Sequence, residues 1–142
     1  MKIRDIMTRQ VTSVGQNSTL GEVAGQMKNL NVGSIPVCDN NSKLLGIVTD
    51  RDMVVRGLTQ GYASQSIVRD VMTANPVFVT PDTDVTEATN LMAEHQVRRL
   101  PVVEGDSLVG IVSIGDVAVR DRLIDEAGDA LSNISEPSRP NI

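Results

Sequence analysis

The 142-residue chain has almost no aromatic residues and a single cysteine. Aromatic residues make up 1% of the chain, so a hydrophobic interior must be built from aliphatic side chains. The same shortage weakens any interpretation in which nucleic acid bases stack on aromatic rings. Cys38 has no partner for an internal disulfide and lies in an apolar run, where we expect a small buried core residue and no sign of secretion.

Positive charge and long apolar runs are also scarce. The formal net charge is -5, so the chain as a whole does not attract nucleic acid or anionic lipid, although a local basic pocket is compatible with it. No segment near the N-terminus has the pattern of a signal peptide, and no apolar run has membrane-spanning length. We therefore expect a cytoplasmic protein whose partners include neither nucleic acid nor a membrane.

The residue types that build common catalytic centres are missing or isolated. One histidine and one cysteine do not form a metal cluster, and the chain has no Gly-rich phosphate loop and no dinucleotide fingerprint. No Ser-His-Asp or Cys-His arrangement is convincing. We expect a protein that is not an enzyme and that has no catalytic residues, no metal site and no required cofactor.

The chain does contain a long internal repeat. The segment Asp5-Ile6-Met7-Thr8 recurs as Asp70-Val71-Met72-Thr73, and residues 5–58 align with residues 70–122. Identical pairs include Pro36 with Pro101 and Gly46 with Gly110. A period of this length that occurs twice indicates a duplicated domain.

Each repeat is predicted to have the order β-α-β-β-α. The first helix of each begins at a capping-box pattern, Thr19-x-x-Glu22 and Asp84-x-x-Glu87, and apolar residues follow at helical spacing. A proline in the middle strand of each repeat favours an edge position or the start of a strand. The predicted strands are 11–14, 35–38 and 44–49, then 77–79, 100–103 and 108–113, and the predicted second helices are 50–58 and 115–123. The predicted fold class is α/β (α+β), with mixed sheets covered by helices.

The predicted organisation has four parts. Residues 1–58 form the first repeat, 59–69 a linker, 70–123 the second repeat, and 124–142 a C-terminal extension that is partly disordered. Residues 124–131 either extend the last helix or form a separate one. Residues 135–142 contain two prolines and little apolar surface, so we expect a disordered tail.

A hydroxyl residue followed three positions later by an aspartate ends the last strand of each repeat. The two copies are Thr49-x-x-Asp52 and Ser113-x-x-Asp116. On the first turn of a helix these side chains share one side, where a carboxylate can accept two ribose hydroxyls and a hydroxyl can donate to a phosphate. The same pattern is a helix cap that needs no ligand, so both interpretations stay open.

The repeated motifs together resemble a pair of CBS (cystathionine β-synthase) domains, known as a Bateman module. The resemblance rests on the Asp-hydrophobic-Met-Thr openings, on segments 32–37 and 97–102, and on the two Gly-Ile-Val-[Thr/Ser]-x-x-Asp ends, and it covers residues 1–123. It implies two repeats with pseudo-two-fold symmetry and two clefts between their sheets. It also implies a homodimer formed through the helices.

The resemblance further implies a regulatory ligand and the residues that contact it. Such modules bind adenosine-containing ligands (AMP, ADP, ATP or S-adenosylmethionine) and regulate an attached or partner protein. The implied ribose contacts are Asp52 and Asp116, the implied phosphate contacts are Thr49, Ser113, Arg98 and Arg99, and the implied adenine contacts are Val11, Thr12, Val77 and Phe78.

Each of these roles has a structural alternative. Arg98 and Arg99 follow a helix end, where solvated cations complement the helix dipole, and the four adenine-contact residues are also typical of a sheet core. The first repeat has Gly33 and Ser34 where the second has the two arginines, which puts a polyphosphate at the first site in doubt unless Arg51 or Arg9 supplies the charge.

Two functions of different classes follow from the sequence. One is a stand-alone bacterial-type CBS pair that senses an adenosyl ligand and signals in trans to an unidentified protein. The alternative is a structural or stress-associated homodimer with vestigial ligand clefts. An enzyme acting on a nucleotide and a nucleic-acid binder are weaker interpretations.

Overall fold

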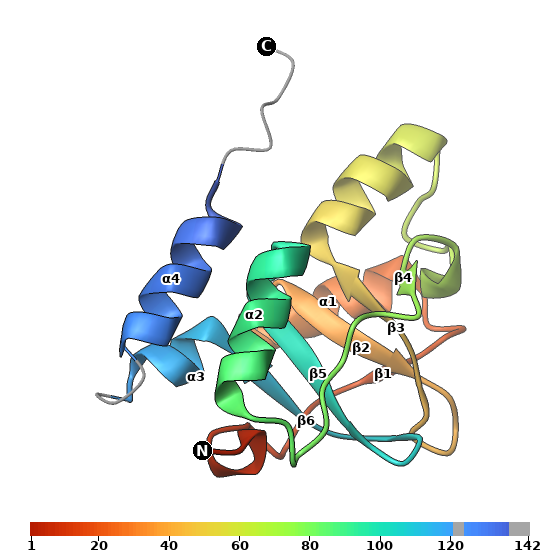
Figure 1. Cartoon of the computed structure of the whole chain (residues 1–142). Helices are drawn as coiled ribbons and strands as arrows, with labels where there is room; N and C mark the ends of the chain where they lie inside the picture. Colours follow the sequence, from red (N-terminus) through yellow and green to blue (C-terminus); the bar gives the residue numbers. More distant parts are fainter. Residues whose placement is uncertain (121–123, 137–142) are drawn as a thin grey trace. The chain divides into compact units, whose positions relative to one another are not determined.

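The computed structural model describes residues 1–120 and 124–136, which form two compact units (Figure 1). Unit 1 consists of Met1–Val11, Val77–Glu104 and the chain from Val109 onward, and unit 2 consists of Thr12–Pro76 and Gly105–Leu108. The compact units therefore differ from the sequence repeats, because the first eleven residues pack with the second repeat.

Unit 2 is built on a four-stranded sheet in the order β1-β2-β3-β4. Strand β1 runs parallel to β2, whereas β2 with β3 and β3 with β4 are antiparallel, so the sheet is mixed as predicted. Helix α1 ends at a left-handed residue, Asn31, and contacts β2. The elements of unit 2 are β1 Val14–Gly15, α1 Leu20–Leu30, β2 Ser34–Cys38, β3 Leu44–Thr49, the π-helix η2 Asp52–Gly57, the 3-10 helices η3 Leu58–Gln60 and η4 Val68–Asp70, and β4 Thr73–Ala74.

Unit 1 repeats this arrangement around a two-stranded sheet of β5 and β6. Single bridges extend the sheet on both sides, a parallel one between Val79 and Val102 and an antiparallel one between Thr8 and Ile111. The β-α-β-β-α order predicted for each repeat is therefore confirmed. The predicted bounds of three elements are wrong: strand 11–14 is found as Val14–Gly15, strand 77–79 is reduced to the bridge at Val79, and helix 50–58 is found as the π-helix Asp52–Gly57. The elements of unit 1 are η1 Ile3–Asp5, α2 Val85–His95, β5 Arg99–Glu104, β6 Ser107–Ser113, α3 Ile114–Ala118 and α4 Ile124–Ile134.

The two Asp-hydrophobic-Met-Thr segments each pack over a strand glycine of the other repeat. A Cβ atom on Gly46 would lie 2.7 Å from both Met72 Sδ and the Thr73 carbonyl oxygen. A Cβ on Gly110 would lie 2.8 Å from the Thr8 carbonyl oxygen and 3.0 Å from the sulfur of the preceding methionine. Only glycine permits this close approach of two backbones, which explains why the glycine and the Met-Thr pair occur together in both repeats.

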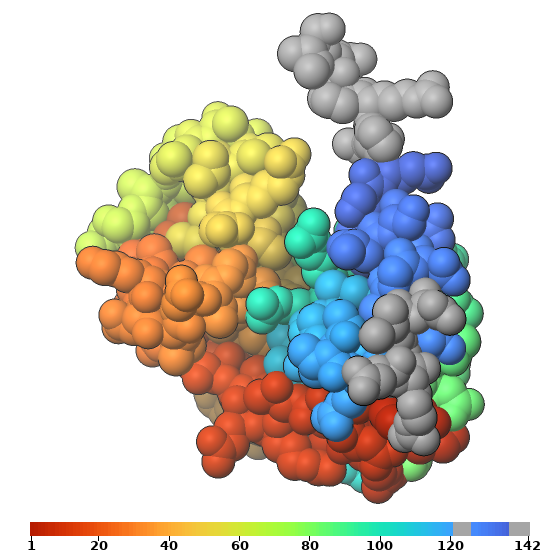
Figure 2. Space-filling view, turned by 90° about the vertical axis from the view of Figure 1, so that its left-hand side faces the viewer, coloured from red at the N-terminus to blue at the C-terminus, as the bar shows by residue number. Residues whose placement is uncertain are grey.

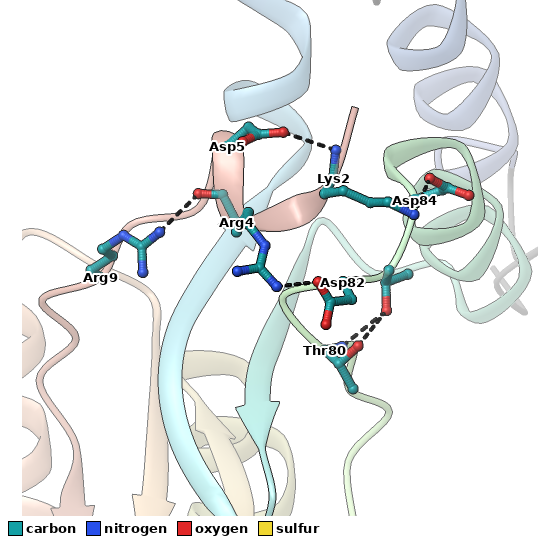
Figure 3. Close-up of polar contacts among 8 residues, drawn as sticks. Lys2, Arg4, Asp5, Arg9, Thr80, Asp82 and Asp84 are labelled. Carbon is teal, nitrogen blue, oxygen red and sulfur yellow. Dashed lines mark hydrogen bonds and ion pairs between the residues drawn. The ribbon is translucent and has the colours of Figure 1, made fainter.

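Polar contacts hold the N-terminal segment to the turn before α2, as Figure 3 shows. Ile3 N donates to the Thr83 carbonyl oxygen at 2.9 Å, and Arg4 forms an ion pair with Asp82. Lys2 Nζ lies 3.0 Å from Asp84 Oδ1, and this cation lowers the pKa of the Asp84 carboxyl. The prediction that Asp84 caps α2 is wrong, because its side chain makes no capping hydrogen bond and pairs with Lys2 instead.

Both interiors are aliphatic, as the composition predicts. Met27 and Met92 are buried core residues, and Cys38 is 4% exposed. Burial raises the pKa of the Cys38 thiol, so the expected role of this residue as a small core side chain is confirmed. The fully buried residues include Ile3, Met92, Leu100 and Val112 in unit 1, and Val23, Ile35, Val48 and Val71 in unit 2.

Pro36 lies in β2, an inner strand, but β1 pairs only with Val37 and Cys38, so the β1 side of β2 is open at the proline, as at a sheet edge. The predicted bounds of the second helix of the second repeat, 115–123, are wrong. The second helix of unit 1 ends at Ala118, and Val119 is 77% exposed because the chain leaves the helix there.

Of the two alternatives for residues 124–131, a separate helix is found. Helix α4 packs against α2 and α3, with Ala127 and Ala130 buried. Figure 2 shows α4, in blue, directly over the lighter blue surface of α3. The predicted disordered tail includes residues 137–142, which lie outside the described residues.

Candidate functional site

In unit 1 the strand β6 passes directly into α3 at the predicted hydroxyl–carboxylate pair. Ser113 N donates to Asp116 Oδ2 at 2.8 Å, and Asp116 N donates to Ser113 Oγ at 3.1 Å. This reciprocal pair is a capping box, so the structural interpretation of the motif is confirmed. The box uses one carboxylate oxygen, and no residue in 1–120 or 124–136 hydrogen-bonds to Asp116 Oδ1.

The equivalent pair in unit 2 has the same bonds and one additional cation. Thr49 N donates to Asp52 Oδ2 at 3.0 Å, and Asp52 N donates to Thr49 Oγ1 at 3.0 Å. Arg56 Nη1 lies 3.8 Å from Asp52 Oδ1, and the Asp52 side chain is 15% exposed. Both motifs are therefore held in one geometry, but the outer oxygen of Asp52 has an ion-pair partner.

The two arginines of the second repeat lie beside the capping box of unit 1. Ile114 N, at the start of α3, donates to the Arg98 carbonyl oxygen at 2.8 Å, and Arg99 begins β5. Both side chains are exposed, and neither makes an ion pair or a side-chain hydrogen bond within the described part of the chain. Two exposed guanidinium groups thus belong to the segment whose backbone bonds to the residue after Ser113.

The predicted adenine-contact residues of unit 1 flank β5. Val79 N donates to the Pro101 carbonyl oxygen at 3.0 Å, and Val103 N donates to the Val79 carbonyl oxygen at 2.8 Å, so this segment runs along β5. Val77 is half-buried and packs against the core, as its structural interpretation requires. Phe78 is 50% exposed and is the only Phe, Tyr or Trp residue of unit 1.

The corresponding place in unit 2 carries different side chains. Asp50 N donates to the Gly33 carbonyl oxygen at 2.9 Å, and Ser34 is the register partner of Thr49. A Cβ on Gly33 would lie 3.2 Å from Asp50 Oδ2, so a carboxylate occupies the space beside this glycine. The Ser34 hydroxyl oxygen is buried and has no hydrogen-bond partner among the described residues.

The first-repeat residues predicted to contact adenine are separated by the boundary between the units. Thr12 is exposed and lies two residues before β1 of unit 2, whereas Val11 belongs to unit 1. Among the cations considered for the first site, Arg9 belongs to unit 1 and donates from Nη2 to the Arg4 carbonyl oxygen at 3.2 Å. The structure therefore groups Thr12 with Thr49 and Asp52 in one unit, without Val11 or Arg9.

The sequence comparison of the repeats predicts that Gly33 and Ser34 replace the two arginines, but it does not consider Asp50. Asp50 occupies the place that Ile114 has in unit 1. Alignment of the two repeats at this position shows the difference. Only the structure shows that the Asp50 carboxylate lies beside Gly33 and makes this place negatively charged.

Comparison with known proteins identifies the family. The CBS domain model matches residues 3–57 and 68–121, so the chain belongs to the CBS domain family and contains a tandem pair. The CBS domain-containing protein YhcV of Bacillus subtilis (strain 168) is 45% identical over 133 residues, which cover 94% of each protein. Hypoxic response protein 1 of Mycobacterium tuberculosis (strain CDC 1551 / Oshkosh) is 38% identical over 116 residues, which cover 81% of each.

Solved structures agree with the fold. The chain superposes on Hypoxic Response Protein I, which has two coordinated zinc ions, with a TM-score of 0.78 and 37% identity, over 83% of this chain and 97% of that one. It matches CBSX2 in complex with AMP with a TM-score of 0.76 and 28% identity, over 87% and 98%. The CBS pair of MJ0100, in complex with 5′-methylthioadenosine and S-adenosylmethionine, gives 0.75 and 25%, over 88% and 96%.

No group of three or more His, Cys, Asp or Glu side chains in the described ranges is arranged to hold a metal ion. Within those same ranges, none of the helices combines the length and the apolarity needed to cross a bilayer.

Proposed function

We propose that this CBS pair is a regulatory module that binds an adenosine-containing ligand, AMP, ADP, ATP or S-adenosylmethionine, and signals in trans to a partner protein. The observation that carries the proposal is the position of Arg98 and Arg99, exposed and without ion-pair partners among the described residues, beside the Ser113–Asp116 capping box. Two structural neighbours support it, since CBSX2 was solved with AMP and the MJ0100 pair with 5′-methylthioadenosine and S-adenosylmethionine.

The side chains of unit 1 match the three parts of a nucleotide. Asp116 keeps Oδ1 as an acceptor for ribose hydroxyls, because its other oxygen is used by the capping box. Ser113 Oγ accepts a bond from the backbone but keeps its own hydroxyl hydrogen for a phosphate oxygen. The guanidinium groups supply charge-assisted hydrogen bonds to that phosphate, and the exposed Phe78 ring supplies an apolar surface for adenine.

Isothermal titration with AMP, ADP, ATP and S-adenosylmethionine tests the proposal. We expect binding at or below the submillimolar range and a loss of AMP affinity of about tenfold or more in Arg98→Gln, because a charge-assisted bond is removed. Asp116→Asn keeps a capping acceptor but weakens the ribose contact, so it should lose affinity while remaining folded. Arg69→Gln, an exposed arginine of unit 2, is the matched charge control.

A titration without heat for any of these ligands would refute the proposal and favour the structural homodimer with vestigial clefts. The proposal also holds that the protein is not an enzyme and acts in the cytoplasm. Incubation with ATP should then give no product, and product formation that Asp116→Asn abolishes would contradict it.

We also propose a homodimer formed through the helices. Unit 2 has an apolar groove of about 260 Å³ lined by α1, η2 and the following turn, with lining residues Leu20, Ala24, Met53, Val54, Leu58 and Tyr62. Val54 is 56% exposed and Leu58 is 64% exposed, and burying such side chains against a second copy would stabilise a dimer. The equivalent helices of unit 1 are covered by α4.

Light scattering after size-exclusion chromatography tests the dimer. Leu58→Glu should shift the protein from dimer to monomer, whereas Val55→Glu, on an exposed valine that does not line the groove, should leave the dimer intact. A dimer unaffected by Leu58→Glu would refute the assignment of this surface.

A further inference from the structure

The two candidate sites have equivalent backbones, so their side chains can be compared position by position. The bond from Ile114 N to the Arg98 carbonyl oxygen, at 2.8 Å, has its counterpart in the bond from Asp50 N to the Gly33 carbonyl oxygen, at 2.9 Å. Both connect the start of the second helix to the residue before the middle strand. A difference in side chains at these positions is therefore a difference in the chemistry of otherwise matched sites.

The side chains at the matched places carry positive charge in unit 1 and negative charge in unit 2. Unit 1 has Arg98 and Arg99 beside the neutral Ile114. Unit 2 has no side chain at Gly33, and the Asp50 carboxylate lies beside it, 3.2 Å from where a Cβ would be. A phosphate in this position would therefore meet a carboxylate instead of two guanidinium groups, and like charges at short range repel.

The remaining charged groups near the unit 2 site do not reverse this difference. Asp52 is a second carboxylate, and the nearby Arg56 is directed to it, with 3.8 Å between Nη1 and Oδ1. Arg56 also donates to Thr73 Oγ1 at 3.3 Å. Arg51 is exposed and bonds to Asp50 through its backbone N, at 2.8 Å, so its side chain can offset one of the two carboxylates but does not give unit 2 the net positive charge of Arg98 and Arg99.

The Ser34 hydroxyl adds an independent observation. Its oxygen is buried without a hydrogen-bond partner in the described part of the chain, although buried polar atoms in native proteins generally have one. Ser34 pairs in register with Thr49, so this hydroxyl lies next to the capping box of unit 2. A hydroxyl both donates and accepts, so the exclusion of phosphate from this site rests on the Asp50 and Asp52 carboxylates.

We infer that the two sites divide the adenosyl ligands by charge. Unit 1 takes the phosphorylated ligand, whereas unit 2 excludes phosphate and takes an adenosyl compound whose 5′ substituent is neutral or cationic, such as a thioether or sulfonium nucleoside. This inference rests on the proposed function. The inference adds to the proposed function a ligand class for each site, assigned from Arg98, Arg99 and Asp50.

Calorimetric titrations with AMP and with 5′-methylthioadenosine, a neutral probe, test the inference on the full chain. AMP should bind with one tight equivalent per chain, and an Arg98→Gln/Arg99→Gln variant should lose it. With AMP saturating, methylthioadenosine should still bind one equivalent, which Asp52→Asn weakens without affecting AMP. AMP at unit 2 should be weaker than at unit 1 by on the order of 10- to 100-fold.

An exchange of side chains supplies the complementary test. Gly33→Arg/Ser34→Arg/Asp50→Ile gives unit 2 the residues of unit 1, and it should create a second tight equivalent of AMP. Asn40→Arg/Asn41→Arg adds two cations in the exposed turn between β2 and β3 and is the matched control, which should leave the stoichiometry at one. Far-UV circular dichroism and urea unfolding establish that each variant is folded.

The possible failures are distinguishable. Two equal AMP equivalents in the unmodified protein, or a folded triple variant that still binds one, would overturn the inference and leave the proposed function standing. One-for-one competition between AMP and methylthioadenosine would also overturn it. No binding of either probe would refute the proposed function itself.

Discussion

Gly46→Ala is the sharpest test of the contact that joins each Met-Thr segment to a strand of the other repeat. The added methyl carbon would lie 2.7 Å from Met72 Sδ and 2.7 Å from the Thr73 carbonyl oxygen, whereas ordinary contacts are longer than 3.4 Å. The sulfur can move, but the carbonyl belongs to β4, which pairs with β3 at Gly46 and Ile47. The substitution must therefore separate two paired strands.

Overpacking of this kind costs about 1–3 kcal/mol, and because the clash is with backbone we expect a loss of about 2–3 kcal/mol in the free energy of unfolding. With a urea dependence of about 2 kcal/mol per molar, the midpoint of unfolding should fall by roughly 1–1.5 M. Urea titration followed by circular dichroism measures it. Gly110→Ala should behave similarly, since its methyl carbon would lie 2.8 Å from the Thr8 carbonyl oxygen.

The matched control is Gly25→Ala in α1, where an added Cβ meets nothing within 4 Å. Alanine in a helix interior is favoured over glycine by about 0.5–1 kcal/mol, so this variant should be slightly stabilised. A midpoint for Gly46→Ala equal to or above that of the unmodified protein would refute the close approach of β4 to β3.

Three further predictions concern single contacts. Ser113→Ala removes the capping acceptor of α3 and should lower the free energy of unfolding by about 1 kcal/mol. Ser132→Ala on α4 is the control and should leave the free energy of unfolding unchanged. Equal stability of the two variants would contradict the capping role of Ser113. Burial raises the pKa of the Cys38 thiol above 9.0, so this thiol should react with a thiol reagent only on unfolding. Because the fold favours the protonated thiol, the contribution of Cys38 to stability should be present below pH 9 and lost as the pH rises further. The Cys38→Ala variant should lack that loss. The Asp84 carboxyl should titrate below pH 3.8 by NMR, and its pKa should return to the ordinary value in Lys2→Ala. Since the pKa is lowered in the folded state, the stabilisation is present above pH 3.8 and disappears as the pH falls through the folded-state pKa. An unchanged midpoint of the Asp84 titration in Lys2→Ala would exclude the ion pair.

Local patterns predicted the elements that local interactions stabilise. Helix α1 was expected from Thr19 and the apolar spacing, and the structure has the Thr19 cap, with Glu22 N donating to Oγ1 at 3.1 Å. The strand 44–49 has the predicted bounds, since a short run of Leu, Ile and Val between polar turns favours one conformation. The capping boxes were also predictable, because each involves residues three positions apart.

Predictions failed where the partner of a residue lies far away in the sequence. The local pattern predicts that Asp84 caps α2, but its carboxylate forms an ion pair with Lys2 and makes no capping hydrogen bond. The pattern around Pro36 predicts an edge or the start of a strand, and only the strand order shows that β2 lies inside the sheet with its β1 side open at the proline. The assignment of residues 1–11 to unit 1 likewise depends on contacts with the chain beyond Pro76.

The amino-acid sequence by itself determined the duplication, the aliphatic interior, the order of the elements and the two hydroxyl–carboxylate motifs, because each depends on composition or on residues a few positions apart. Only the tertiary structure decided that each Met-Thr segment packs on the strand of the other repeat, and that Asp50 lies beside Gly33 while Arg98 and Arg99 remain exposed. Those features depend on which distant backbones approach within a few ångströms, and sequence spacing carries no measure of that distance.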